Sequence, residues 1–309
     1  MTTPRPRPEV SVVLPTYNDA SILRHALAHL ARQALPPTAF EVVVVDDGST
    51  DETPEVVAAA GAGPARVRSV RFDRNRGRSA ARNAGIRAAL APLIVFVDSD
   101  VLVRSDFLQQ HMEIHRSAAR PVVGRGPVVL ITEPEIPARP PIIGMSPAYI
   151  DTANASVMRQ ALIDAGLFDE GFPAYGWEDF ELGLRLKARG LPRAYSSAAV
   201  AFHVQPHPTT DSFGDWLAKE EDRARTALYL LRKHPSREAR MLIQDTALQR
   251  AGHFVWGGAG LLSARQTLSL ARWLHARNLH SLAFFITRGI LNRHYLQSLD
   301  RLRMEKGNR

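Results

Sequence analysis

The sequence contains no cysteine and no long uncharged apolar run. The absence of cysteine excludes disulfides, thiolate metal sites and a cysteine nucleophile. A membrane-spanning helix needs about 18 or more apolar residues, so we expect none. The opening stretch, MTTPRPRPEV, has two arginines without an apolar segment behind them and does not resemble a secretory signal. These absences predict a cytoplasmic protein, with peripheral contact at the inner face of a membrane as an open alternative.

Basic residues are concentrated in the last quarter of the chain. Residues 233–309 contain 13 Lys/Arg and 4 Asp/Glu, and the formal charge of the whole chain is +8. Such a segment suits an anionic partner, for example a membrane surface or a phosphorylated substrate. The alternative is a solvated helical face rich in arginine. We do not expect nucleic acid as a partner, because the segment lacks the interleaved aromatic residues of a recognisable binding module.

The first third of the chain alternates between apolar, strand-like runs and segments with helical spacing. This order is typical of an α/β fold with an open, mostly parallel sheet and helices on both faces. Ligands of such sheets bind beyond the carboxyl ends of the strands. The polar stretches PTYN, DDGS, DRNRGRS and DSD all occupy such ends. The predicted strands cover 10–18, 40–50, 67–73 and 92–103, and the predicted helices cover 19–35, 51–60 and 78–90.

The rest of the chain predicts further strands and then helices only. Single strands are expected over 122–132 and 193–204, and a helix over 176–190. From about 212 onward the pattern is helical. We therefore predict two domains, a ligand-binding and catalytic domain over 1–211 and a basic helical region over 212–309.

Asp98 and Asp100 end the apolar run PLIVFVDSDVLV. Unpaired buried carboxylates are costly, so we expect them to meet a cation or hydrogen-bond donors. Two carboxylates at a strand end also provide the hard oxygen ligands that Mg²⁺ or Mn²⁺ prefers. Taken alone, the pair is better explained by a turn aspartate and a helix cap. Asp19 is another candidate helix cap, at the start of the first predicted helix.

The motifs together resemble the family 2 glycosyltransferases, which have the GT-A fold. VSVVLPTYN, VVVVDDGSTD, NRGRSAARNAG and VFVDSD stand in the order of that family. GWEDFELGLRLKARG resembles the family's later acidic motif, and AFHV matches a histidine that some members use. The resemblance covers about residues 9–205. It implies a Rossmann-like GT-A domain followed by a helical extension.

The resemblance also implies a role for each matched residue. One group is expected to bind the nucleotide sugar, with Asp47 of VVVVDD accepting a hydrogen bond from the base. Its members are Pro15, Tyr17, Asp47, Gly77, Arg82, Asp98 and Ser99. The alternatives are a helix cap for Asp47 and an ordinary half-buried aromatic for Tyr17.

A second group is expected to carry the chemistry. Asp100 and His203 would bind Mn²⁺ or Mg²⁺. Asp179 and Glu178 would be the catalytic residues, with Asp179 as the base. Acidic residues in the first turn of a helix are also favourable without any chemistry. Trp177 and Asn154 are candidates for contact with the sugar or the acceptor. The indole could equally serve packing alone.

The implied activity is inverting, metal-dependent transfer of one sugar from a nucleotide sugar, expected to be a UDP-sugar. The acceptor would be a saccharide or a lipid-linked intermediate in glycan, glycolipid or cell-envelope polysaccharide biosynthesis. The lack of a Q-x-x-R-W motif argues against a processive synthase. One alternative is a sugar nucleotidyltransferase, although PTYND replaces its Gly-rich phosphate loop. Another is a catalytically degenerate partner of an active transferase, although Asp100 and Asp179 are both present.

Overall fold

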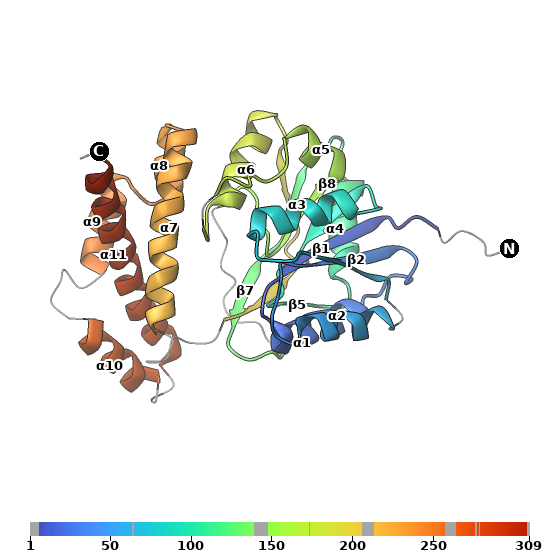
Figure 1. Ribbon diagram of the computed structural model, residues 1–309, viewed down its shortest axis with the longest axis horizontal. Coiled ribbons are helices and arrows are strands. Elements are labelled where there is room, and N and C mark those ends of the chain that lie inside the picture. The colour runs from blue at the N-terminus through green and yellow to red at the C-terminus, as the bar shows by residue number, and fades with distance from the viewer. Residues whose placement is uncertain are drawn as a thin grey trace. The chain divides into compact units, whose positions relative to one another are not determined.

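The chain forms two compact units. One comprises Met1–Glu170 and Glu178–Pro206, and the other comprises Gly171–Trp177 and His207–Arg309. Strands are found in the first unit, whereas the second is helical (Figure 1). The predicted domain boundary between 211 and 212 lies outside the described residues. The computed structural model describes residues 6–63, 65–138, 148–172, 174–205, 213–256, 264–275, 277 and 279–307.

The first unit is built on a sheet whose larger part is parallel. Within the described residues it contains seven strands in the order β3-β2-β1-β4-β8-β6-β9. β1 pairs in parallel with β2 and β4, and β3 pairs in parallel with β2. β8 is antiparallel to both β4 and β6. The strands are β1 (Val10–Thr16), β2 (Phe40–Asp46), β3 (Val67–Arg71), β4 (Leu93–Phe96), β6 (Val123–Arg125), β8 (Ala155–Met158) and β9 (Arg193–Tyr195).

Helices cover both faces of this sheet, as the sequence predicts (Figure 1). In β2, Val42 and Val44 pack in a cluster with residues of α1, α2 and α4. Val43 and Val45 point the other way and pack against α3. Because both faces are buried, the strand is continuously apolar instead of alternating. The helices are α1 (Ala20–Ala31), α2 (Thr53–Gly61), α3 (Arg78–Ala88), α4 (Phe107–Arg116), α5 (Arg159–Asp164) and α6 (Glu178–Ala188).

A smaller sheet begins directly after the D-x-D motif. In it β10 (Ala201–Val204) is antiparallel to β5 (Val101–Val103) and parallel to β7 (Val128–Ile131). The single strands predicted over 92–103, 122–132 and 193–204 are therefore wrong. Each is divided, with its first part in the large sheet and its second part in the small one.

The breaks within 122–132 and 193–204 lie against each other. A Cβ on Gly126 would lie 1.8 Å from the carbonyl oxygen of Ala199, so only glycine allows this approach. The buried amide of Asn154 donates to the carbonyls of Pro127, at 2.8 Å, and Ala199, at 2.7 Å. These contacts hold the breaks together and let both segments pass from one sheet to the other.

The described residues of the second unit beyond 212 are mainly helical, which confirms the helical pattern predicted for this part of the chain. The longest helix, α11, packs against α7, α9 and α10. None of the described helices combines the length and apolar character needed to cross a bilayer. The helices are α7 (Phe213–Lys233), α8 (Arg237–Leu242), α9 (Ala247–Trp256), α10 (Ala264–His275) and α11 (His280–Gly307).

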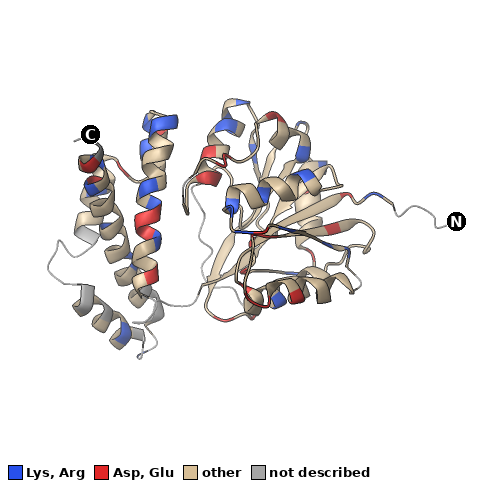
Figure 2. Cartoon of the chain, in the orientation of Figure 1, with Lys and Arg blue, Asp and Glu red and all other residues tan. Residues whose placement is uncertain are grey.

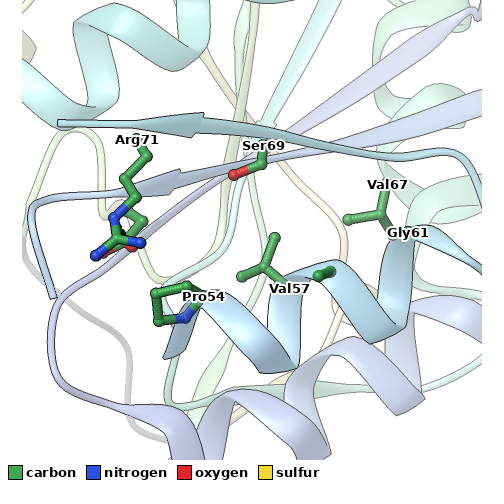
Figure 3. Close-up of a pocket in the computed structure, with 8 residues that line it drawn as sticks. Pro54, Val57, Gly61, Val67, Ser69 and Arg71 are labelled. Atoms are coloured by element: carbon green, nitrogen blue, oxygen red, sulfur yellow. Dashed lines mark ion pairs between the residues drawn. The ribbon is translucent and has the colours of Figure 1, made fainter. Parts of the chain in front are cut away.

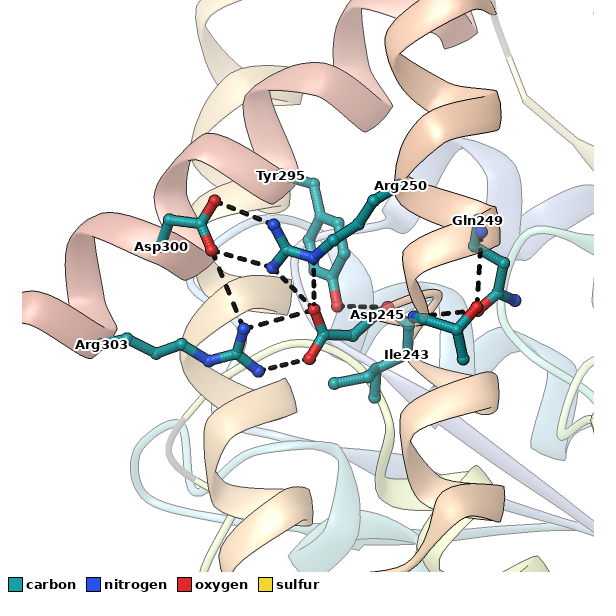
Figure 4. Close-up of polar contacts among 8 residues, drawn as sticks. Ile243, Asp245, Gln249, Arg250, Tyr295, Asp300 and Arg303 are labelled. Carbon is teal, nitrogen blue, oxygen red and sulfur yellow. Dashed lines mark hydrogen bonds and ion pairs between the residues drawn. The ribbon is translucent and has the colours of Figure 1, made fainter.

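An ion-pair network ties α9 and α11 together (Figure 4). The guanidinium of Arg250 contacts Asp300 through two hydrogen bonds, at 2.8 and 2.9 Å. Asp245, which precedes α9, accepts hydrogen bonds from Arg250 and Arg303. Burial tends to raise the pKa of Asp245, but the two arginines outweigh it and hold that pKa below its usual range. The ionised carboxylate of Asp245 therefore connects Arg250 of α9 with Arg303 of α11.

We expect Asp245→Asn to lower the free energy of unfolding by about 2 kcal/mol, because two partly buried guanidinium groups lose their shared anion. Since the folded-state pKa is depressed, the stabilising effect is present above the unfolded-state pKa. It is lost as the pH falls through the folded-state value. Urea unfolding at pH 7 and at pH 4 should show the difference between the variants shrinking at the lower pH. Asp222→Asn, in the exposed pair with Arg225, is the matched control, with an expected change below about 0.5 kcal/mol.

Candidate functional site

Asp47 fixes the loop that follows the third strand. Its two carboxylate oxygens accept hydrogen bonds from the backbone N–H groups of Arg76, at 2.7 Å, and Gly77, at 2.9 Å. Gly48 permits the close approach, because a Cβ there would lie 2.5 Å from the backbone of Arg74. Burial raises the pKa of Asp47 despite these hydrogen bonds. Asp47 therefore links the ends of β2 and β3 and does not cap α2.

Pro15 and Tyr17 lie at the end of β1, which neighbours β2 in the sheet. Pro15 pairs with Val45 of β2, and the Tyr17 side chain is 43% exposed. Asn18 accepts a hydrogen bond from the backbone of Thr50, which joins the PTYN and DDGST stretches. The structure thus brings Pro15, Tyr17, Asp47 and Gly77 to the carboxyl ends of neighbouring parallel strands, as predicted for a ligand site.

Arg82 joins the D-x-D motif to the later acidic motif. Its guanidinium is buried and donates to Asp98, at 2.9 Å, and to Glu178, at 2.8 Å. Burial opposes the charge of Arg82, but the two carboxylates outweigh it and raise its pKa. Burial likewise tends to raise the pKa of Asp98, and Arg82 lowers it. The partners of Arg82 are thus two carboxylates, whereas the resemblance implied a contact with the nucleotide sugar.

Asp100 and His203 meet at the start of the small sheet. The Oδ2 atom of Asp100 lies 3.0 Å from Nε2 of His203, and both side chains are partly exposed. Burial opposes protonation of the imidazole, but the hydrogen bond to Asp100 and the nearby carboxylates raise the pKa of His203. β5 and β10 pair directly after Asp100, with Val101 opposite His203, which explains why residues so far apart in sequence converge.

Asp179 occupies the first turn of α6. Burial raises its pKa well above the ordinary value of 3.8, and the negative charges of Glu178 and Asp151 add to the effect. Its Oδ1 atom accepts a hydrogen bond from the backbone N–H of Phe180 at 2.8 Å. A carboxylate with a raised pKa is a better proton acceptor near neutral pH than an ordinary aspartate.

Two acidic residues near these groups were not assigned a site role from the sequence. Asp19 stands just before α1, but its carboxylate accepts from the hydroxyl of Ser99 at 2.7 Å and does not cap that helix. Burial and then Asp100 raise the pKa of Asp19. Asp151 acts electrostatically on both Asp179 and His203. The position of Asp19 directly after PTYN was the available signal. Asp151 belongs to no motif that we recognised.

Two predicted contact residues are engaged in contacts within the protein. Asn154 is fully buried, and its amide is engaged with His111, Pro127 and Ala199. Trp177 is 5% exposed and belongs to the helical unit, where its indole packs. Of the two alternatives for Trp177, sugar stacking or packing, the structure shows packing.

A pocket of about 200 Å³ lies between α2 and the edge strand β3 (Figure 3). Pro54, Val57 and Arg71 line it, and the guanidinium of Arg71 pairs with Asp46 at 3.3 Å. None of the predicted site residues is among its lining residues. The pocket is therefore separate from the candidate site.

Asp100 and His203 fit a divalent cation by their chemistry, because a carboxylate oxygen and an imidazole nitrogen are both ligands of Mn²⁺. No group of three or more His, Asp or Glu suited to a metal ion occurs in the part of the chain that the structure describes. An ion at this pair would take its other ligands from water and phosphate, as Mg²⁺ usually does.

The architecture is that of the GT-A glycosyltransferases, which confirms the predicted fold. The structure aligns with a mannosyltransferase from Pyrobaculum calidifontis in complex with GDP-Man and Mn²⁺, with a TM-score of 0.63 and 18% identity over 95% of this chain and 87% of that one. It also aligns with S. aureus TarS 1–349 in complex with UDP-GlcNAc, with a TM-score of 0.54 and 18% identity over 96% and 92% of the two chains.

The sequence comparison identifies the family. Residues 11–147 match the model described as glycosyl transferase family 2. The chain is 32% identical over 268 residues to validoxylamine A glucosyltransferase of Streptomyces hygroscopicus subsp. limoneus. That alignment covers 74% of this chain and 57% of the relative, so the chain spans little more than half of the relative's length. The chain therefore carries a family 2 glycosyltransferase domain, and the resemblance seen in its motifs is confirmed.

We expect Arg82→Lys to destabilise the sheet-containing unit by about 3 kcal/mol, because an ammonium group cannot donate to Asp98 and Glu178 in the fork geometry of a guanidinium. Thermal and urea unfolding would measure the loss. Arg87→Lys, on the same helix in a pair with Glu170 and 60% exposed, is the control and should change stability by less than about 0.5 kcal/mol. Equal effects of the two substitutions would contradict a bridging role for Arg82.

Proposed function

We propose that the protein is an inverting glycosyltransferase that moves one sugar at a time from a nucleotide sugar to an acceptor hydroxyl. The observation that carries the proposal is the bridge from Asp98 through Arg82 to Glu178, which joins the D-x-D motif to the residue beside Asp179. Family 2 membership and the GT-A fold support the same reading. The role in glycan, glycolipid or cell-envelope polysaccharide biosynthesis belongs to this proposal.

The strand-end residues would bind the nucleotide. The exposed ring of Tyr17 offers a flat face for the base, and each oxygen of Asp47 can accept another hydrogen bond beside the one it already has. The solved structures that align with this chain were bound to GDP-Man and to UDP-GlcNAc, so GDP-sugars and UDP-sugars are both donors to test. We take a UDP-sugar as the first choice.

Asp100 and His203 would hold Mn²⁺ or Mg²⁺. When bound there, the ion would neutralise charge that develops on the leaving diphosphate. The carboxylates around this position are Asp19, Asp98, Asp100, Asp151, Glu178 and Asp179. An anionic diphosphate would be repelled by such a set without a cation.

Asp179 would act as the base. An incoming hydroxyl attacks the anomeric carbon from the side opposite the leaving diphosphate, and Asp179 accepts the hydroxyl proton as the new bond forms. Its raised pKa fits this role, because the carboxylate must be ionised yet able to hold a proton. Attack opposite the leaving group inverts the anomeric configuration. The acceptor would be a saccharide or a lipid-linked intermediate, and contact of the basic helical region with an anionic membrane stays a prediction.

The first experiment is calorimetric titration of the full chain with UDP, GDP and TDP, with and without Mn²⁺. We expect binding of one diphosphate that needs Mn²⁺, and a loss of at least about tenfold in affinity for Asp100→Ala or His203→Ala. Asp164→Ala, an exposed carboxylate on α5, should leave binding unchanged. If a folded wild-type protein binds none of the three diphosphates, the transferase proposal is wrong. Diphosphate binding without turnover of any nucleotide sugar would favour the degenerate-partner alternative.

The pH dependence of turnover tests the base. Because Asp179 must be ionised, kcat/KM for the nucleotide sugar should fall as the pH drops through the pKa of Asp179, which lies well above 3.8. Glu178→Gln removes a neighbouring negative charge and so lowers the pKa of Asp179. The acidic limb of the pH profile of kcat/KM should therefore move to lower pH. Glu170→Gln, a control outside the site, should leave the limb in place. An acidic limb that Glu178→Gln does not move, or moves to higher pH, would contradict Asp179 as the base.

A further inference from the structure

The segment that leads into the candidate base belongs to the helical unit. Residues Gly171–Trp177 cluster with the helices, although Glu178 and Asp179 directly after them belong to the sheet-containing unit. The chain therefore crosses between the two units at the peptide bond before α6.

One face of α7 holds this segment at three places. Phe172 meets Tyr229 edge to face, with ring centroids 4.8 Å apart. The carbonyl of Tyr175 accepts from the hydroxyl of Thr226 at 3.1 Å. The three helix positions, 223, 226 and 229, are spaced by one turn each, so their side chains share a face. The segment runs antiparallel to α7, with Trp177 reaching Arg223 at the third place.

Trp177 is the most firmly held of the three. Its indole Nε1–H donates to the carbonyl of Arg223 at 2.8 Å, and the guanidinium of Arg223 lies 5.0 Å from the centre of the indole ring. The same guanidinium lies 5.0 Å from the ring of Tyr295 on α11 and donates to the buried carboxylate of Glu220 at 2.5 Å. Arg288 of α11 contacts that carboxylate as well, at 3.3 Å. The indole is thus fixed by residues of two helices.

The backbone at this point adopts a conformation that needs support. Gly176 has φ of 103°, and Trp177, which is not glycine, has φ of 69°. A residue other than glycine adopts positive φ only when its surroundings compensate for the strain. Here the buried indole and its hydrogen bond provide that support, directly before the first residue of α6.

We propose that the face of α7 formed by Arg223, Thr226 and Tyr229 is a positioning element for the candidate catalytic base. It holds Trp177, which fixes the start of α6 and so the direction of the Asp179 carboxylate. The inference rests on the proposed function for the role of Asp179. Trp177 and the three helix residues act through the backbone, and none of them is a catalytic residue.

The test compares two identical substitutions within the helical unit. Trp177→Phe keeps an aromatic ring but removes the N–H that donates to Arg223. Trp273→Phe, on α10 with a half-exposed ring, is the matched control. Hydrogen exchange of peptides covering the start of α6 should speed up by about tenfold in Trp177→Phe and should not change in Trp273→Phe. Protection in β1 and β2 should be unaffected in both.

Turnover gives the second readout, with the nucleotide sugar that binds in the titration and water as acceptor. Trp177→Phe should lower kcat by about tenfold, while affinity for the nucleoside diphosphate stays within about twofold of wild type. Unchanged exchange at α6 in Trp177→Phe overturns the inference. An equal loss of kcat and of diphosphate affinity also overturns it, because that pattern indicates general damage.

A further variant and the wild type separate the possible failures. If Trp177→Phe does not fold, Tyr229→Leu removes the ring contact with Phe172 and should raise exchange at α6 in the same way. Lack of diphosphate binding by the wild type would refute the proposed function, whereas the exchange result still reports whether α7 fixes the start of α6. If the wild type turns over and kcat is unchanged in both Trp177→Phe and Tyr229→Leu, this inference is refuted and the proposed function is not.

Discussion

The buried guanidinium of Arg82 is the contact on which the arrangement of the site depends. Three charged groups leave bulk water together at Arg82, Asp98 and Glu178, and each would be costly to bury alone. Their hydrogen bonds require α3, the end of β4 and the start of α6 to meet at one place. The bridge therefore relates a motif at one strand end to a motif about eighty residues further on. Any substrate that spans both motifs meets them at a fixed separation.

The charge balance around this bridge explains why a cation suits the site. Two nitrogens of the Arg82 guanidinium donate to carboxylates, so its charge is already matched within the protein. Asp100 and Asp179 remain as acidic groups outside this bridge, one partly exposed beside His203 and the other with its pKa raised by burial. The two acids thus differ in surroundings. A carboxylate beside an imidazole suits metal binding, and a carboxylate held at a raised pKa suits proton transfer.

The sequence predicted the parts of the fold that local patterns control. The parallel strands, their helices and the polar strand ends follow from continuous apolar runs and helical spacing. The divided strands could not be found this way, because the breaks depend on the approach of Gly126 to Ala199. Asn154 was assigned to the ligand because its actual partners, the carbonyls of Pro127 and Ala199, come from segments distant in sequence that local patterns do not relate to it. The partners of Arg82 were hidden likewise, since phosphate and carboxylate bind a guanidinium in the same geometry.

The basic excess of the last quarter has a partner that the sequence division concealed. Counting from residue 233 separated the arginines of α11 from the acidic residues of α7, and both signs are interleaved along α7 (Figure 2). Arg288 pairs with Glu220, and Arg301 pairs with Glu221. Asp245 and Asp300 engage two more arginines (Figure 4). Because α7 and α11 pack against each other, much of this charge is matched within the helical unit. One of these pairs, Arg288 with Glu220, also reaches the carboxylate that Arg223 contacts, on the face of α7 that holds Trp177.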